Sequence, residues 1–253
     1  MITRIIRKLT GSKHVKPEQN QQSKPNRQAG QAFDVPNYDA MNKARTAHLN
    51  WMQLPVANKS VLEIGCGIGR MSEYFEAQNC KLHCVDGRAE NIEKLKELYP
   101  GRTAEVMDLE TDQILNCGKH DIVFCYGLLY HLVDVLGLIK KAATVCSDMM
   151  IVETCVSPVE SNVCYIVRED VDDVTQALHG LGSRPSPSYI VTCLHTAGFK
   201  YVYAPKELPD HEQFRYTMVK DLGQWKERRL TRNIFIATYA PIESQTLVLM
   251  SKI

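Results

Sequence analysis

The chain lacks several features that would assign it to common classes of protein. It has no run of about 18 apolar residues, so we expect no transmembrane segment. Its net charge of +1 gives no electrostatic reason to expect a nucleic acid as the main partner. These absences leave a protein of 253 residues, 44% of them hydrophobic, which suffices for one good core and a short extension.

The nine cysteines lack the spacing of a disulfide framework or of a zinc site. Their number is odd, and no C-x-x-C pair occurs. Most of them fall in segments that we expect to be core strands or helices. We therefore expect buried free thiols, no metal site and a reducing, cytoplasmic location.

Charge is distributed unevenly along the chain. Residues 1–31 carry seven basic side chains and one acid, a net charge of +6, which leaves −5 for residues 32–253. Four apolar residues among the first nine lie on one helical face, so residues 1–16 form either a basic amphipathic contact with an anionic membrane or a frayed tail. The Gln-rich stretch that follows predicts a disordered linker. Residues 32–253 are predicted to form one domain.

Residues 61–69, V-L-E-I-G-C-G-I-G, are the most informative stretch of the chain. A short apolar run predicts a buried strand, and the three alternating glycines predict a turn that leads into a helix. Such a turn places backbone N–H groups beside a crevice, and glycine allows φ > 0 there. The NAD fingerprint G-x-G-x-x-G would need glycine where Arg70 stands. A turn that serves only helix–strand packing is the alternative.

Three more strand candidates follow, at residues 81–85, 104–107 and 121–126. Asp86 ends the first of them, where it would either accept hydrogen bonds from ribose hydroxyls or cap the next helix. Asp108 ends the second. Successive strand–helix units with polar or small residues at the strand ends predict a parallel sheet with its site on that edge.

The E-x-G-x-G-x-G spacing, with these strand ends, resembles motif I of the class I S-adenosylmethionine (SAM) methyltransferases. The resemblance implies an α/β, Rossmann-like fold: a mostly parallel seven-stranded sheet with an antiparallel last strand and helices on both faces. It also implies SAM as the cofactor, bound by the following residues: Glu63, Gly65, Cys66, Gly67, Gly69, Asp86, Gly87, Asp108, Leu109, Cys125, Tyr126 and Gly127. Asp108 would accept a hydrogen bond from the adenine amino group, unless it only caps its loop.

Residues 125–134, C-Y-G-L-L-Y-H-L-V-D, are similar to a stretch in one branch of these enzymes. The branch contains the tRNA wobble-uridine carboxymethyltransferases and many small-molecule and sugar methyltransferases. It implies that Tyr130 and His131 face the acceptor, and the ordinary pKa of histidine suits a general base. A helix-start histidine bonded to backbone is the alternative. Asp134 is a candidate to orient His131. Glu153, at the end of the next predicted strand, is the second candidate for a base or an acceptor-binding group, and a polar lid to the crevice is the alternative.

The remaining segments are expected to surround these residues. Residues 40–52 predict a helix beside the cofactor, with Asn42 or Arg45 facing it and His48 packed on the sheet. Residues 155–187 lose regular patterning and predict an insertion that roofs the acceptor pocket.

A helix opening at Pro187 and strands at residues 200–204 and 233–239 would complete the fold. Arg184 and His211 are candidate acceptor-binding residues. The cations between the last two strands form either a solvated face or a site for an anionic acceptor.

We expect a SAM-dependent methyltransferase that acts on a hydroxyl of a small-molecule or glycan acceptor. A tRNA wobble-uridine-type enzyme is an alternative, weakened by the missing helical amino-terminal domain and by the negative charge of the predicted domain. A non-catalytic SAM-binding interaction protein, recruited to a surface by its basic tail, is the other alternative.

Overall fold

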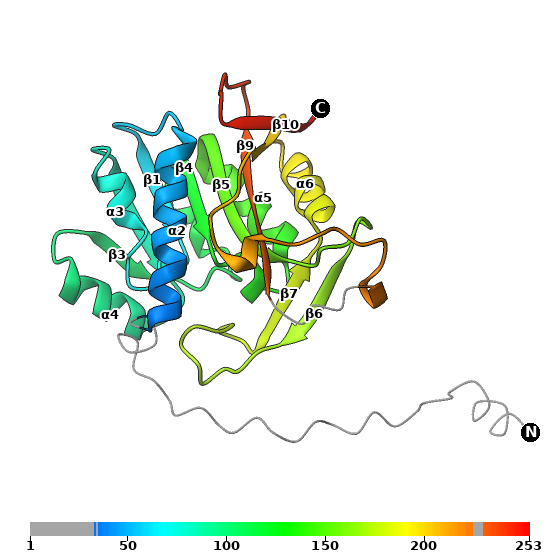
Figure 1. The fold of residues 1–253 in the computed structure, drawn as a ribbon. Coiled ribbons are helices and arrows are strands. Elements are labelled where there is room, and N and C mark those ends of the chain that lie inside the picture. Colours follow the sequence, from blue (N-terminus) through cyan, green and yellow to red (C-terminus); the bar gives the residue numbers. More distant parts are fainter. Residues whose placement is uncertain (1–32, 34, 225–229) are drawn as a thin grey trace, which may run out of the picture.

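A sheet forms the centre of the molecule, and helices cover both of its faces (Figure 1). The computed structural model describes residue 33, residues 35–224 and residues 230–253. The sheet has eight strands in the order β3-β2-β1-β4-β5-β9-β8-β10. Their bounds are Ser60–Ile64 (β1), Lys81–Asp86 (β2), Thr103–Val106 (β3), His120–Tyr126 (β4), Cys146–Val156 (β5), Tyr201–Pro205 (β8), Thr231–Thr238 (β9) and Leu247–Lys252 (β10).

The direction of the strands places the site. Strands β3, β2, β1, β4 and β5 run parallel, and β9 runs antiparallel to both β5 and β8. Because parallel strands bring their carboxyl ends to one edge, the residues that follow β1, β2 and β4 meet there. The predicted class, a mostly parallel Rossmann-like sheet with an antiparallel strand near its end, is confirmed.

Alternate residues of the central strands enter two different cores. Leu62 and Ile64 of β1 lie in a cluster with residues of α5 and α6, whereas Val61 lies in a cluster with residues of α2 and α3. Leu95 of α4 packs against Cys84 of β2. Both faces of the sheet are therefore buried, as parallel sheets require. The helices are Pro36–Met52 (α2), Ser72–Glu76 (α3), Ala89–Leu98 (α4), Val135–Val145 (α5) and Pro187–Thr196 (α6).

The predicted count of seven strands was wrong, because β10 pairs with β8 at the edge. Three consecutive residues of β10 are exposed (Val248, Leu249 and Met250), so its sequence has no alternating pattern. The predicted insertion also contains a hairpin, of β6 Cys164–Arg168 and β7 Leu181–Pro185. Exposed residues and Gly182 weaken its strand signal. Cys146 is the first residue of β5.

Other predictions concern the thiols, the membrane and the tail. All nine cysteines are free, and six of them are buried. Among the described residues no helix is long and apolar enough to cross a bilayer. The amphipathic start and the linker predicted for residues 1–31 lie outside the described residues.

Candidate functional site

A cavity of ≈ 280 Å³ opens where the carboxyl ends of β1, β2 and β4 meet α2 and the insertion. Most of the predicted cofactor-binding residues line it: Glu63, Gly65, Cys66, Gly67, Asp86, Gly87, Asp108, Leu109, Tyr126 and Gly127. We call this part of the wall the glycine-loop end. Tyr130 and His131 line the other part, the His131 end, together with Arg45 and Arg232.

The glycine loop brings bare backbone to the cavity wall. Gly65 and Gly67 have φ values of +70° and +54°, which residues with a side chain rarely adopt. A Cβ at Gly65 would lie 2.9 Å from the Cβ of Leu128. Gly69 does not line the cavity, and its carbonyl accepts a hydrogen bond from Arg102 Nη1 at 2.5 Å. The cradle for a ligand is therefore formed by Gly65 to Gly67.

Asp86 is held beside this loop by three donors. Its Oδ2 accepts from the Gly67 N–H at 2.9 Å, and its Oδ1 accepts from the Arg88 N–H and the Asn91 amide, each at 3.0 Å. Burial raises the pKa of Asp86 above its ordinary value against the effect of these donors. The N-cap of α4 is Arg88, so the alternative role of Asp86 as helix cap was wrong. Asn91 also lines the cavity, and its buried Oδ1 has no hydrogen-bond partner among the described residues.

Asp108 and Leu109 follow β3 at the same end. Asp108 Oδ1 accepts from the Glu110 N–H at 3.0 Å, which is the predicted loop contact. Its Oδ2 lies 3.0 Å from His179 Nε2, a residue of the insertion. Asp108 thus joins the cavity wall to the insertion, and its contact with an adenine amino group stays a prediction.

Glu63 lies deep at the glycine-loop end and is 3% exposed. The Ser72 hydroxyl donates a hydrogen bond to its Oε2. Burial raises the pKa of Glu63 well above its ordinary value, which favours the protonated, neutral carboxyl. A protonated carboxyl has a hydrogen to donate as well as oxygens that accept.

Helix α2 closes the cavity from one side. Three of its residues line the wall: Tyr38, Asn42 and Arg45. Phe33 lies just before the helix, where a Cβ at Gly67 would meet its ring at 3.4 Å. Within the described part of the chain, Arg45 Nε and the Tyr126 hydroxyl are buried without hydrogen-bond partners. Buried polar groups are normally hydrogen-bonded, so these two indicate a polar ligand, and a carboxylate is the group that binds a guanidinium best.

Arg45 and Arg232 share one carboxylate, that of Glu153. Arg45 Nη2 lies 2.5 Å from Glu153 Oε2, and Arg232 Nη1 lies 2.9 Å from Oε1. Burial would raise the pKa of Glu153, but the two guanidinium groups outweigh burial and lower it. The ionised carboxylate is fully buried and does not line the cavity, so the prediction that Glu153 is a second base was wrong. It is the counter-ion of two cations, which leaves one positive charge in excess.

Arg232 was predicted within a run of cations that is either solvated or an anion site. It is only 7% exposed and lines the cavity. Its Nη2 donates to the Tyr130 hydroxyl at 3.1 Å, and its Nε donates to Gln213 Oε1 at 2.7 Å. Together with the bond to Glu153, these contacts occupy each of its three nitrogens, so Arg232 is part of the wall.

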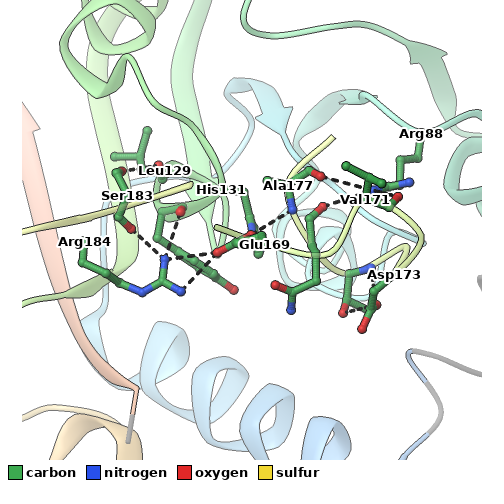
Figure 2. Close-up of polar contacts among 12 residues, drawn as sticks. Arg88, Leu129, His131, Glu169, Val171, Asp173, Ala177, Ser183 and Arg184 are labelled. Atoms are coloured by element: carbon green, nitrogen blue, oxygen red, sulfur yellow. Dashed lines mark hydrogen bonds and ion pairs between the residues drawn. The ribbon is translucent and has the colours of Figure 1, made fainter. Parts of the chain in front are cut away.

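His131 ends the short helix η3 Leu129–His131, and its Nδ1 contacts the carboxylate of Glu169 (Figure 2). Burial would raise the pKa of Glu169, but the hydrogen bond from His131 and the neighbouring Arg184 help to hold it below its ordinary value. An ionised carboxylate only accepts, so Nδ1 carries the proton and Nε2 keeps its lone pair. Burial lowers the pKa of His131. The ring is therefore neutral at pH 7, as a general base must be.

Asp134 does not orient His131, contrary to the prediction. Its carboxylate accepts from the Gly137 N–H at 2.8 Å and caps α5. Helix η3 ends at His131 and α5 begins at Val135, so the two residues do not share a helix and the expected i,i+3 contact is not formed.

Three further predicted site residues lie outside the cavity wall. Cys125 points into the core on the other face of the sheet from its neighbours in β4. Arg184 Nη2 donates to Glu169 Oε1 at 3.1 Å, so Arg184 contacts the carboxylate that holds His131 and does not line the cavity itself. His211 caps the helix η4 Glu212–Phe214 through the Gln213 N–H, at 3.2 Å. His48 contacts the Glu207 carbonyl at 2.7 Å, which agrees with the predicted packing role.

Glu169 and Asn91 are site residues that the sequence interpretation missed. Glu169 directly follows Arg168, the last residue of β6, in a charged stretch that offers only a weak signal of a functional carboxylate. Asn91 belongs to the first turns of α4, where a polar residue is ordinary.

Comparisons with known proteins agree with this geometry. A family described as "Methyltransferase domain" matches residues 31–204. The ubiquinone biosynthesis O-methyltransferase of Ralstonia nicotianae is 24% identical over 113 residues, which are 42% of this chain and 48% of that protein. The chain therefore spans about half the length of this curated relative.

Two solved structures have a similar fold. The N-terminal domain of EvdMO1 with bound S-adenosylhomocysteine (SAH) superposes with a TM-score of 0.59 at 20% identity, over 79% of this chain and 81% of that one. Magnesium protoporphyrin IX methyltransferase from Synechocystis PCC 6803, with bound SAM, gives a TM-score of 0.51 at 15% identity. That superposition covers 80% of this chain and 81% of the other.

Proposed function

The chain belongs to the methyltransferase-domain family, and from that membership we propose that it methylates a hydroxyl group of a small-molecule or glycan acceptor. S-adenosylmethionine is the cofactor, since solved structures of the same fold carry it or its product SAH. The observation that carries the proposal is a neutral histidine, His131, held by a buried carboxylate in the wall that the glycine loop shares.

The names of two relatives support an acceptor of this kind. The N-terminal domain of EvdMO1 has been crystallised in the presence of SAH and D-fucose, a sugar. The Ralstonia relative is an O-methyltransferase. Because the matched proteins differ in their acceptors, the fold alone does not name the acceptor of this chain.

The glycine-loop end has the groups to hold the cofactor. Asp86 and the unpartnered Oδ1 of Asn91 would accept hydrogen bonds from the ribose hydroxyls. From the His131 end, the unsatisfied Arg45 Nε would donate to the carboxylate of the amino acid tail. That carboxylate also balances the excess positive charge of the cluster around Glu153. When bound, the cofactor supplies an electrophilic methyl group.

His131 and its neighbours would perform the acceptor chemistry. Nε2 removes the hydroxyl proton while Glu169 fixes the proton on Nδ1. Tyr130, held by Arg232 at 3.1 Å, forms the adjacent wall. Fixed groups in a closed cavity align the nucleophile and exclude water, which is the main task of an enzyme whose methyl donor is already reactive.

Transfer of labelled methyl from SAM into fractionated metabolite and glycan extracts tests this function. Wild-type protein should label a hydroxyl compound, and His131→Ala should lower the initial rate by about 10²- to 10⁴-fold. His83→Ala is the control, because His83 lies outside the cavity wall. An unchanged rate in His131→Ala would remove His131 as the base. SAH binding without labelling of any extract would favour the non-catalytic alternative.

The cellular setting is part of the same proposal. The nine free thiols support a reducing, cytoplasmic environment. Membrane contact through residues 1–16 and the tRNA-modifying alternative stay predictions, because no described residue bears on them.

A further inference from the structure

One loop of the insertion, residues 169–181 between β6 and β7, contacts both ends of the cavity (Figure 2). Its first residue, Glu169, contacts His131. Its later residues Val174, Thr175, Gln176 and Leu178 line the cavity wall. The predicted insertion therefore covers more than an acceptor pocket, because it also reaches the glycine-loop end.

At the His131 end, every oxygen of the Glu169 carboxylate has a partner. Oε2 receives the contact from His131 Nδ1 and a hydrogen bond from the Ala177 N–H at 2.8 Å. Oε1 accepts from Arg184 Nη1 at 3.2 Å and from Nη2 at 3.1 Å. The side chain is 2% exposed, so these contacts replace solvent. A buried carboxylate with this many donors holds its position firmly.

At the glycine-loop end, the loop is fastened to the strand ends that surround the predicted adenosine position. Arg88 Nη2 donates to the carbonyl of Val171 at 3.1 Å and, at 3.4 Å, to those of Gln176 and Ala177. His179 Nε2 lies 3.0 Å from Asp108 Oδ2. A Cβ at Gly87 would lie 3.1 Å from Leu178.

The two ends are joined inside the loop by the bond from the Ala177 N–H to Glu169. Ala177 also offers its carbonyl to Arg88, so one residue connects the carboxylate behind His131 with the anchor beside Asp86. A ligand at the glycine-loop end lies against Val174, Thr175, Gln176 and Leu178 of this loop. A ligand that shifts these residues also shifts Ala177, which is one of the donors to Glu169.

We propose that Glu169 is the positioning residue for His131, and that loop 169–181 makes this positioning depend on the bound cofactor. The inference rests on the proposed function and adds a coupling to it: a bound SAM that holds the loop against the strand ends also strengthens the Glu169 contact that orients the base. By linkage, a correctly oriented His131 then strengthens cofactor binding by the same factor.

Charged groups from three elements face His131. Glu169 is the first residue of the loop, Arg184 lies in β7 and Arg232 lies in β9. The carboxylate raises the pKa of the imidazole, and both guanidinium groups lower it. Loss of the carboxylate alone should therefore lower the pKa of His131 and also remove the preference for a proton on Nδ1.

Nitrogen NMR of ¹⁵N-histidine-labelled protein tests the proposal without an acceptor. In wild-type protein we expect the proton of neutral His131 on Nδ1, and saturating SAH should increase that population. Glu169→Gln, whose neutral amide oxygen is a weaker acceptor, should weaken the preference with and without SAH and shift the titration of His131 to lower pH. Glu160→Gln is the matched control, because Glu160 is an exposed carboxylate of the same insertion.

Arg88→Ala tests the coupling from the other end, since it leaves Glu169 in place. We expect the Nδ1 preference to weaken without SAH and to return at saturation, and the SAH dissociation constant to rise by about 5-fold or more. Lys96→Ala is its control, because Lys96 is exposed on the same helix.

The outcomes separate this inference from the proposed function. If wild-type protein does not bind SAH, the proposed function fails. If SAH binds but the wild-type proton lies on Nε2, or Glu169→Gln leaves the tautomer unchanged, Glu169 is not the positioning residue. If SAH has no effect on His131 in wild type or in Arg88→Ala, the coupling is overturned. Should Glu169→Gln not fold, the wild-type and Arg88→Ala spectra decide both points.

Discussion

The two ends of the cavity are built in different ways. At the glycine-loop end, the ligand-facing groups lie at the ends of four successive strands, β1 to β4, and much of the surface is backbone. At the His131 end, the contacts join residues far apart in the chain: 108 positions separate Arg45 from Glu153, and 38 separate His131 from Glu169. The first end is thus a product of local sequence. The second exists only after the whole sheet has assembled.

Two buried glutamates show the same contrast in their charge. Glu63 of β1 has a pKa raised well above its ordinary value by burial, and its partner is a hydroxyl. Glu153 of β5 has its pKa lowered by two arginines that outweigh burial. The glycine-loop end therefore has a neutral carboxyl where the His131 end has an ion cluster.

The largest effect is expected at Glu153. Glu153→Gln leaves Arg45 and Arg232 buried without their shared counter-ion, which should lower the free energy of unfolding at pH 7 by about 3–5 kcal/mol. The folded pKa of Glu153 lies below its ordinary 4.5, so the stabilising effect is complete above that pH and is lost as the pH falls through the folded pKa. Urea unfolding over a pH series measures both effects, with Glu160→Gln as control. A loss under about 1 kcal/mol would contradict the ion cluster.

The next largest effect is expected for Gly67→Val, which should weaken cofactor binding at the glycine-loop end. The side chain would occupy the cradle, so we expect SAH binding at least about 100-fold weaker, near 2.7 kcal/mol, by calorimetry. A Cβ there meets only the Phe33 ring at 3.4 Å, so the fold should persist.

Gly118→Val is the matched control for that variant. Gly118 has a comparable φ of +73°, and a Cβ there would meet nothing within 4 Å. Because ψ is −168° there, Gly118 lies in a region that is adopted almost only by glycine, so Gly118→Val introduces backbone strain without filling the cradle, and SAH affinity should stay at the wild-type value. Equal losses of affinity in both variants would mean that strain, and not the cradle, explains the effect.

Smaller losses of SAH affinity are expected at the two aspartates of the glycine-loop end, and their sizes show which aspartate contributes more. Asp86→Asn should weaken SAH binding by about 10-fold, because Asp86 is buried with its oxygens fixed by three donors. Asp108→Asn should have a weaker effect, because its side chain is 28% exposed and already contacts His179. A larger loss at Asp108 in the same titration would reverse this ranking.

The smallest effect is expected at Glu63. Glu63→Gln replaces a neutral carboxyl with a neutral amide and should change the free energy of unfolding by less than about 1 kcal/mol at mildly acidic pH. Because the folded pKa is raised, the stabilising effect of Glu63 is present at low pH and is lost as the pH rises through that pKa. Wild type should therefore lose stability relative to Glu63→Gln as the pH rises above the ordinary 4.5 toward the raised pKa, the opposite of Glu153→Gln. If the free energy of unfolding of wild type and of Glu63→Gln had the same pH dependence, the contrast between Glu63 and Glu153 would be refuted.

The glycine-loop end could be predicted because each of its signals is short-range. The glycine spacing predicts φ > 0 at Gly65 and Gly67, and an aspartate at a strand end predicts a hydrogen-bond acceptor at the edge of the sheet. The strand and helix patterns also sufficed for the class of fold. They missed β10 and the β6–β7 hairpin, whose exposed residues carry no alternation.

The His131 end could be predicted only in part. The residue type and position of His131 indicated a base, but its partner was sought nearby, at Asp134, and the structure supplies Glu169 instead. Arg232 was placed in a charge run, since nothing local shows that it meets Glu153 across the sheet. Ion pairs between strands that are far apart in the sequence depend on how those strands pair and on their register, and a single sequence shows neither.

The position of Phe33 has a practical consequence for anyone who prepares this protein. Its ring contacts Tyr38 edge-on, lies close to Gly67 and lines the cavity. A tag or fluorophore attached at residue 33 itself would sit at the cavity wall, where it is expected to slow ligand exchange. A label joined after β10 sits at the opposite border of the sheet and should leave titrations undisturbed.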